Sequence, residues 1–167
     1  MVENNNQEPV VVQIPDMSLA KCAKVSLTPE DDVMSFMHNW AKSRGLSDAG
    51  QRNFGFDVPV SPEQNSKGLR GYAYWIQVPP DTKGDQDVVV EPFTGASYIS
   101  LRLSKPFRNP FEIIPQGWQN LSRFIETKQL KVACCAPGDC LEEVIGEGEE
   151  ADMLIYIKLA ETDSSPR

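Results

Sequence analysis

The sequence Val-Val-Val-Glu-Pro-Phe-Thr-Gly at residues 88–95 repeats a pattern first seen at residues 10–17, Val-Val-Val-Gln-Ile-Pro-Asp-Met. Each copy leads into an alternating run of equal length, at residues 18–26 and 96–104. A segment with helical periodicity follows each run, and then two strand-like segments. This order predicts a duplicated strand-helix-strand-strand unit. Ligands often bind between such units, so the duplication also predicts a central cleft.

Alternation and turn residues predict the strands. In the first half we expect them near residues 9–15, 19–25, 54–58 and 71–78, and in the second near residues 88–92, 97–103, 140–145 and 153–159. Thr28 and Pro29 predict the start of one helix and Gly45 its end, while a second helix is expected to begin near Pro115. The fold class is therefore α+β: one mostly antiparallel sheet of about eight strands, with two helices on one face and pseudo-twofold symmetry.

The same pattern predicts the domain organisation. A polar tail at residues 1–8 precedes a single domain at residues 9–160, and residues 161–167 form a second polar tail. Within the domain, repeat one spans residues 9–80 and repeat two spans residues 86–160. A chain of 167 residues has room for one domain with a full core.

Composition narrows the class of function. The net charge of −8 argues against direct binding of nucleic acid, which requires a basic surface. No apolar stretch reaches the roughly 20 residues of a membrane span, and no secretory signal is evident, so we expect a cytoplasmic protein. Cys134, Cys135 and Cys140 lack the spacing of a zinc site. We expect no metal and no cofactor.

Motifs for nucleophilic catalysis are missing from the sequence. It contains one histidine, His38, which lies in a helical pattern, and neither a Gly-x-Ser-x-Gly motif nor a phosphate-binding glycine loop. The candidate acid is Glu142, which lies in a predicted strand between Leu141 and Val144. Because Glu142 and Glu143 point to opposite faces, one of them is expected to face the covered or concave side. The alternative is that both are solvated acids at a sheet edge.

Aromatic residues form the second candidate feature. Flat rings beside an anionic group suit a pocket for cationic or aromatic compounds. Alternation places Trp75 on the face opposite Tyr72 and Tyr74, so it is less readily explained as core than the aromatic residues of the helices. The candidate ligand-binding residues are Glu142, Trp75, Tyr72, Tyr98, Tyr74, Phe93 and Trp118.

Ordered segments of the chain resemble the GyrI-like small-molecule-binding domain, the effector-binding domain of AraC- and MerR-type regulators. The segments are IPDM (residues 14–17), WAKSRGL (40–46), GYAYWIQVP (71–79), VVVEPFTGASYISLRL (88–103), IPQGWQNLSRFI (114–125), CLEEVI (140–145) and MLIYIKLA (153–160). The resemblance implies tandem modules around a ligand cleft, with the family's central acid falling on Glu142 and aromatic cleft residues on Tyr72, Trp75 and Tyr98. Ala73 and Val144 depart from the family pattern, which commonly has an acid and an aromatic residue there.

Three functions follow from the residues and the resemblance. The first is a binding protein, without a DNA-binding domain of its own, for a small apolar or cationic organic ligand. The second is a hydrolase of strained-ring or related xenobiotic compounds, with Glu142 as the catalytic residue. The third is a protein-interaction module, such as a gyrase inhibitor, acting on a protein partner or as a homodimer.

Overall fold

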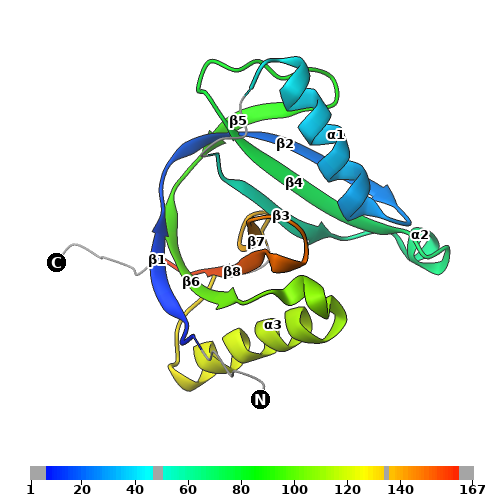
Figure 1. The fold of residues 1–167 in the computed structure, drawn as a ribbon. Coiled ribbons are helices and arrows are strands. Elements are labelled where there is room, and N and C mark those ends of the chain that lie inside the picture. Colours follow the sequence, from blue (N-terminus) through cyan, green and yellow to red (C-terminus); the bar gives the residue numbers. More distant parts are fainter. Residues whose placement is uncertain (1–6, 47–50, 134–135, 162–167) are drawn as a thin grey trace. The chain divides into compact units, whose positions relative to one another are not determined.

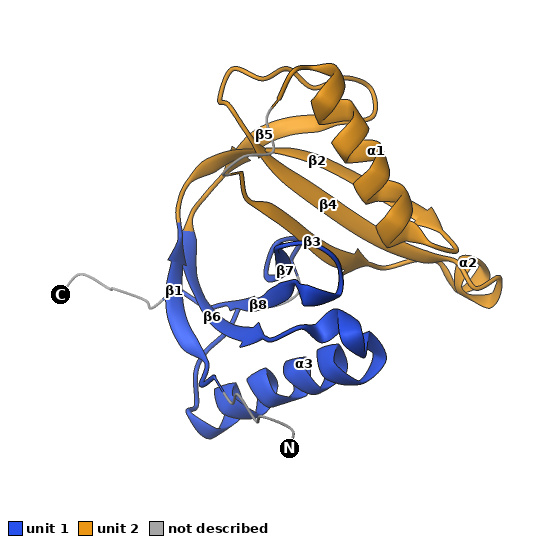
Figure 2. Ribbon diagram, in the orientation of Figure 1, with its two compact units in different colours: residues 1–14, 96–167 blue, residues 15–95 orange. Residues whose placement is uncertain are grey.

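The computed structural model describes residues 7–46, 51–133 and 136–161 (Figure 1). The fold is α+β, as the sequence predicted, and the eight strands belong to one antiparallel sheet. The chain divides into two compact units, which Figure 2 colours separately. Unit 2 spans residues 15–95, and unit 1 contains the chain up to residue 14 and from residue 96 onward.

Four strands and one long helix make up each unit. Unit 2 contains β2 (Met17–Ser26), α1 (Pro29–Ser43), β3 (Asn53–Val58), the short α2 (Pro62–Ser66), β4 (Arg70–Val78) and β5 (Val89–Phe93). Unit 1 contains β1 (Val10–Ile14), β6 (Ala96–Leu103), α3 (Pro110–Thr127), β7 (Cys140–Ile145) and β8 (Asp152–Lys158), with 3-10 turns at Pro106–Arg108 and Gly148–Glu150. The strand order is β3-β4-β2-β5 in unit 2 and β1-β6-β8-β7 in unit 1.

Strand pairing does not follow the repeat boundaries in the sequence. The first strand, β1, pairs with β6, and β5 pairs with β2. The first strand of repeat one, β1, therefore belongs to unit 1, with the other strands of repeat two. The first strand of repeat two, β5, belongs to unit 2, with the other strands of repeat one. The boundaries of the two repeats remain a prediction from the sequence.

The first helix, α1, begins at Pro29 as predicted, and Gly45, with a φ of +65°, follows its end. The Thr28 side chain makes no capping bond to the helix backbone. Instead, the hydroxyls of Ser26 and Thr28 both donate to the carboxylate of Asp32 in the first turn. The start of the helix is thus held by a side-chain cluster rather than by a backbone cap.

The second long helix begins earlier than the sequence predicted. The expected start was near Pro115, but α3 begins at Pro110 and contains Pro115. Pro110 suits the first helical position, which needs no amide hydrogen, and the Asn109 carbonyl accepts from the amide of Ile113. Pro115 lacks the amide that would bond to the carbonyl of Phe111, a residue that is 94% exposed. In this exposed turn water can satisfy that carbonyl.

Each long helix packs on one sheet face of its own unit. In unit 2, α1 packs on β2 and β4 (Figure 1). Met37 and Trp40 of this helix contact Tyr72, Tyr74 and other buried residues of the two strands. In unit 1, α3 packs on β6 and β8. The α3 core contains Ile99, Leu101, Leu103, Leu121, Ile125, Met153 and Ile155.

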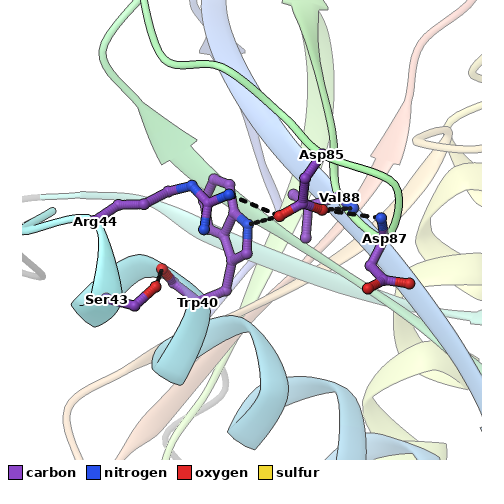
Figure 3. A network of polar contacts seen from close by, with 6 residues as sticks. All are labelled: Trp40, Ser43, Arg44, Asp85, Asp87 and Val88. Atoms are coloured by element: carbon purple, nitrogen blue, oxygen red, sulfur yellow. Dashed lines mark hydrogen bonds and ion pairs between the residues drawn. The ribbon is translucent and has the colours of Figure 1, made fainter.

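The segment between β4 and β5 is held against the end of α1 (Figure 3). The Asp85 carboxylate accepts hydrogen bonds from the indole of Trp40 at 2.9 Å and the guanidinium of Arg44 at 2.7 Å. Its other oxygen accepts from the amides of Asp87 and Val88. These donors lower the pKa of Asp85 from 3.8 to about 2, with the amide of Asp87 contributing most.

Candidate functional site

Strand registers assign each side chain to a sheet face, because residues directly opposite in an antiparallel pair point to the same side. The term far face denotes the sheet side of a unit turned away from its own long helix. The far face of unit 1 carries Tyr98, Ser100, Leu141, Glu143 and Tyr156. The far face of unit 2 carries Lys21, Phe54, Phe56, Trp75 and Phe93.

Glu142, the acid singled out from the sequence, lies on the helix side of unit 1. It is opposite Ile155 of the α3 core, and its carboxylate accepts a 3.3 Å hydrogen bond from the indole of Trp118. Glu142 is half-buried. Its role in ligand binding or catalysis remains a prediction. The neighbouring acid, Glu143, lies on the far face of the same unit.

Glu143 is the buried carboxylate of β7. Its side chain is 4% exposed, and it accepts a 2.7 Å hydrogen bond from the hydroxyl of Tyr156 on β8. Tyr156 is 2% exposed, so this phenol-carboxylate pair is shielded from water. Hydrogen bonds to an ionised acceptor are stronger than neutral ones, and burial increases their strength further.

Tyr98 of β6 adds a second tyrosine to this face. Its ring is 1% exposed and lies edge to face against Tyr156, with centroids 6.1 Å apart and planes at 83°. Its hydroxyl donates to the carbonyl of Gly138 at 2.8 Å. Burial, together with the negative charge of Asp139, raises the pKa of Tyr98 to about 12. Tyr98 therefore stays a neutral hydrogen-bond donor throughout the physiological range.

Polar burial is concentrated in this part of the molecule. Among the described residues, the buried polar and charged side chains are Ser100, Asp139 and Glu143, all in unit 1. Asp139 accepts a 2.8 Å hydrogen bond from the amide of Ala136, which closes the turn that carries Gly138. Burying such groups is costly unless they are satisfied, and proteins accept this cost mainly at functional sites. The far face of unit 1 is therefore the candidate site.

Trp75 lies on the far face of unit 2, on the side predicted from alternation. It is 6% exposed and contacts the rings of Phe56 and Phe93, whose centroids lie 4.8 Å and 6.5 Å away. The ammonium of Lys21 lies 3.9 Å from the centre of the Trp75 ring. This face is thus aromatic and carries a cation of the protein itself.

The remaining predicted aromatic residues lie on the helix sides. Tyr72 and Tyr74 belong to the core beneath α1, and Tyr74 contacts His38 with 3.3 Å between hydroxyl and ring nitrogen. Trp118 packs against the α3 core. Their ligand-binding roles remain predictions. The structure thus brings together Trp75 with Phe93, and Glu142 with Trp118.

The sequence reasoning set Glu143 aside and missed Tyr156 entirely. A signal for Tyr156 was available, because Met153, Ile155 and Ile157 alternate as an apolar series and leave Tyr156 on the other face. The choice between the two acids required the pairing of β7 with β8, which the sequence does not contain.

The described residues contain no group of three or more histidine, cysteine or acidic side chains able to hold a metal ion. Cys134 and Cys135, from the cysteine cluster noted in the sequence, lie outside the described residues. Within the same described part of the chain, no helix is long and apolar enough to span a membrane.

Solved structures share this fold. The chain matches the C-terminal domain of EcmrR with a TM-score of 0.70 at 10% identity, covering 93% of this chain and 98% of that one. A hydrolase from Listeria innocua matches with a TM-score of 0.59 at 10% identity, covering 92% of each chain. SAV2435, in a structure bound to tetraphenylphosphonium, matches with a TM-score of 0.52 at 14% identity, covering 92% of this chain and 94% of that one.

At these identities the matches establish the fold alone, because one fold supports many functions. The chain spans 58% of the EcmrR chain seen in a complex with DNA. No protein-family model matches the sequence. No curated protein matches it either.

Proposed function

We propose that the protein binds a small organic cation, with the carboxylate of Glu143 as the group that recognises the charge. The observation that carries this proposal is the burial of Glu143, which is 4% exposed on a sheet face that the unit's helix does not cover. A buried carboxylate favours a positively charged partner, since low polarity strengthens the attraction between opposite charges.

The neighbours of Glu143 suit the same kind of ligand. The hydroxyl of Tyr156 donates a 2.7 Å hydrogen bond to the carboxylate. The rings of Tyr98 and Tyr156 lie at 83° to each other and supply π-electron surface near the charge. Aromatic faces attract cations and bury the apolar part of an organic ion. Glu143 is therefore a better candidate for the recognition acid than Glu142.

The family proposal points the same way. The ordered motifs resemble the GyrI-like effector-binding domain, and the fold is shared with the EcmrR C-terminal domain and with SAV2435, which was solved with tetraphenylphosphonium. We therefore place the chain in this family as a proposal and infer a lipophilic cation as the ligand class.

A matched pair of ions tests the charge preference. Tetraphenylphosphonium and tetraphenylborate have nearly the same shape and opposite charge, so calorimetric titration of the full chain with both separates charge recognition from apolar binding. We expect saturable binding of the cation at least tenfold tighter than that of the anion, about 1.4 kcal/mol. Glu143→Gln should reduce this preference. Equal binding of both ions by the wild-type protein contradicts the proposal.

A hydrolase is the second candidate, and the Tyr156–Glu143 pair is the observation that favours it. A carboxylate fixed by a 2.7 Å hydrogen bond is positioned to accept a proton from an attacking water. Turnover of ester and strained-ring substrates tests this function. Activity that is lost in Glu143→Gln and kept in Glu142→Gln supports it, and activity unchanged in both variants excludes this mechanism.

A further inference from the structure

We propose that the ring face of Trp75 is a cation-binding site occupied by Lys21 of the same chain, so that external ammonium compounds bind there only by displacing Lys21. This inference goes beyond the function proposed for Glu143, because all of its residues belong to unit 2. It assigns Lys21 as a specificity-determining residue and names the ligand class of the site as primary ammonium compounds.

The position of Lys21 is set by the backbone. Lys21 of β2 pairs directly with Trp75 of β4, so both side chains leave the sheet on the far face. The ammonium lies 3.9 Å from the centre of the indole ring. The same nitrogen donates to the carboxylate of Glu91 on β5 at 2.8 Å. An aromatic face below and a carboxylate beside the nitrogen together make a complete ammonium site.

Two further aromatic rings contact Trp75. Phe56 and Phe93 meet Trp75 with interplanar angles of 86° and 63°. The side chain of Lys21 is 19% exposed and Trp75 is 6% exposed. A cation–π contact gains strength as water is removed, so Lys21 is an effective competitor for this ring.

The carboxylate of Glu91 defines which cations can replace Lys21. Because Glu91 accepts an N–H from the lysine, a replacement must supply a positive charge and an N–H donor together. Primary alkylammonium ions have both properties, whereas a tetraphenylphosphonium ion has no N–H. We therefore expect this site to favour primary ammonium compounds once Lys21 is removed.

The same strand contains a matched control. The ammonium of Lys24 lies 4.2 Å from the centre of the Phe36 ring, on the helix side of β2. Lys24→Ala removes the same charge and another lysine-aromatic contact without touching Trp75. It therefore reports the effect of a lower net charge on the binding of any cation.

The experiment is complementation of Lys21→Ala with n-propylammonium, which matches the atoms that the substitution removes. Tryptophan fluorescence and calorimetry of the full chain should show saturable binding about tenfold tighter than in the wild type or Lys24→Ala. n-Propanol should not bind. Equal binding in Lys21→Ala and Lys24→Ala, or no saturable binding in a folded Lys21→Ala protein, overturns the proposal.

Two further measurements keep the test decisive. If Lys21→Ala does not fold, the wild-type NMR spectrum still reports the contact, because the ring current of Trp75 shifts the ε-methylene protons of Lys21 upfield. Unshifted protons contradict the proposal. Glu143→Gln in the Lys21→Ala background should leave n-propylammonium binding unchanged, whereas loss of that binding would show that the Trp75 site is not separate from the Glu143 site.

Discussion

The far faces of the two units have equivalent strand positions but carry different residues at them. In unit 2, residues directly opposite one another across β2, β4 and β3 are Lys21, Trp75 and Phe54. In unit 1, the equivalent residues across β6, β8 and β7 are Ser100, Tyr156 and Leu141. Further along β3 and β7, Phe56 of unit 2 corresponds to Glu143 of unit 1. Each unit thus has an aromatic residue on the middle one of these three strands, Trp75 or Tyr156, whereas Lys21 of unit 2 corresponds to Ser100 of unit 1.

The helix sides of the two units share one feature, an apolar residue of the long helix buried against the strands. Met37 of α1 and Leu121 of α3 are both fully buried against their own strands. In both units the long helix is held to the sheet by buried apolar side chains. The far faces, which no helix of their unit covers, were free to acquire different chemistry.

The largest expected effect tests whether the two long helices stabilise the fold to a similar extent. Met37→Ala and Leu121→Ala each remove a fully buried side chain, so each should lower the free energy of unfolding by about 2–5 kcal/mol. Urea denaturation followed by circular dichroism measures both. A loss below about 1 kcal/mol in only one variant would show that the two helices are not equivalent anchors.

A smaller effect tests the difference within the far face of unit 1. Tyr156→Phe removes a hydrogen bond to a carboxylate, whereas Tyr98→Phe removes one to the Gly138 carbonyl. Because charged acceptors gain more from a donor, Tyr156→Phe should cost about 1.5–3 kcal/mol and Tyr98→Phe about 0.5–1.5 kcal/mol. The same urea measurement applies, and the reverse order contradicts a charged, buried Glu143.

The sequence predicted the fold better than the site. Alternation and turn residues indicated all eight strands. The predicted start of the second helix, near Pro115, was wrong because α3 begins at Pro110 and contains Pro115 in an exposed turn. The repeat in the sequence aligns Val10 with Val88. The helix sides instead make Ala20 of β2 and Ile99 of β6 equivalent, which aligns Val10 with Val89.

A shift of one residue also changes which of the two acids is expected on the far face. A slip of one position exchanges the two faces of a strand. Two adjacent acids, Glu142 and Glu143, therefore cannot be distinguished without the pairing partner. The fold class does not depend on this register, whereas the face assigned to each acid does.

The smallest expected effect concerns the loop contact of unit 2. The pKa of Asp85 falls from 3.8 to about 2 in the folded chain, so its ionised form stabilises the fold above about pH 3.8, and this contribution is lost as the pH falls toward 2. Asp85→Asn should therefore flatten the decline in unfolding free energy between pH 4 and pH 2. The control is Asp81→Asn, an exposed acid of the same loop. Identical pH profiles for the wild type and Asp85→Asn would contradict this assignment.

The most direct test of the central claim compares neighbouring acids in one titration. Glu143→Gln and Glu142→Gln change the same chemical group on opposite faces of β7, so calorimetry with tetraphenylphosphonium isolates the face that recognises the cation. The account predicts at least tenfold weaker binding in Glu143→Gln, about 1.4 kcal/mol, and wild-type affinity in Glu142→Gln. Weaker binding in Glu142→Gln together with unchanged binding in Glu143→Gln would contradict it.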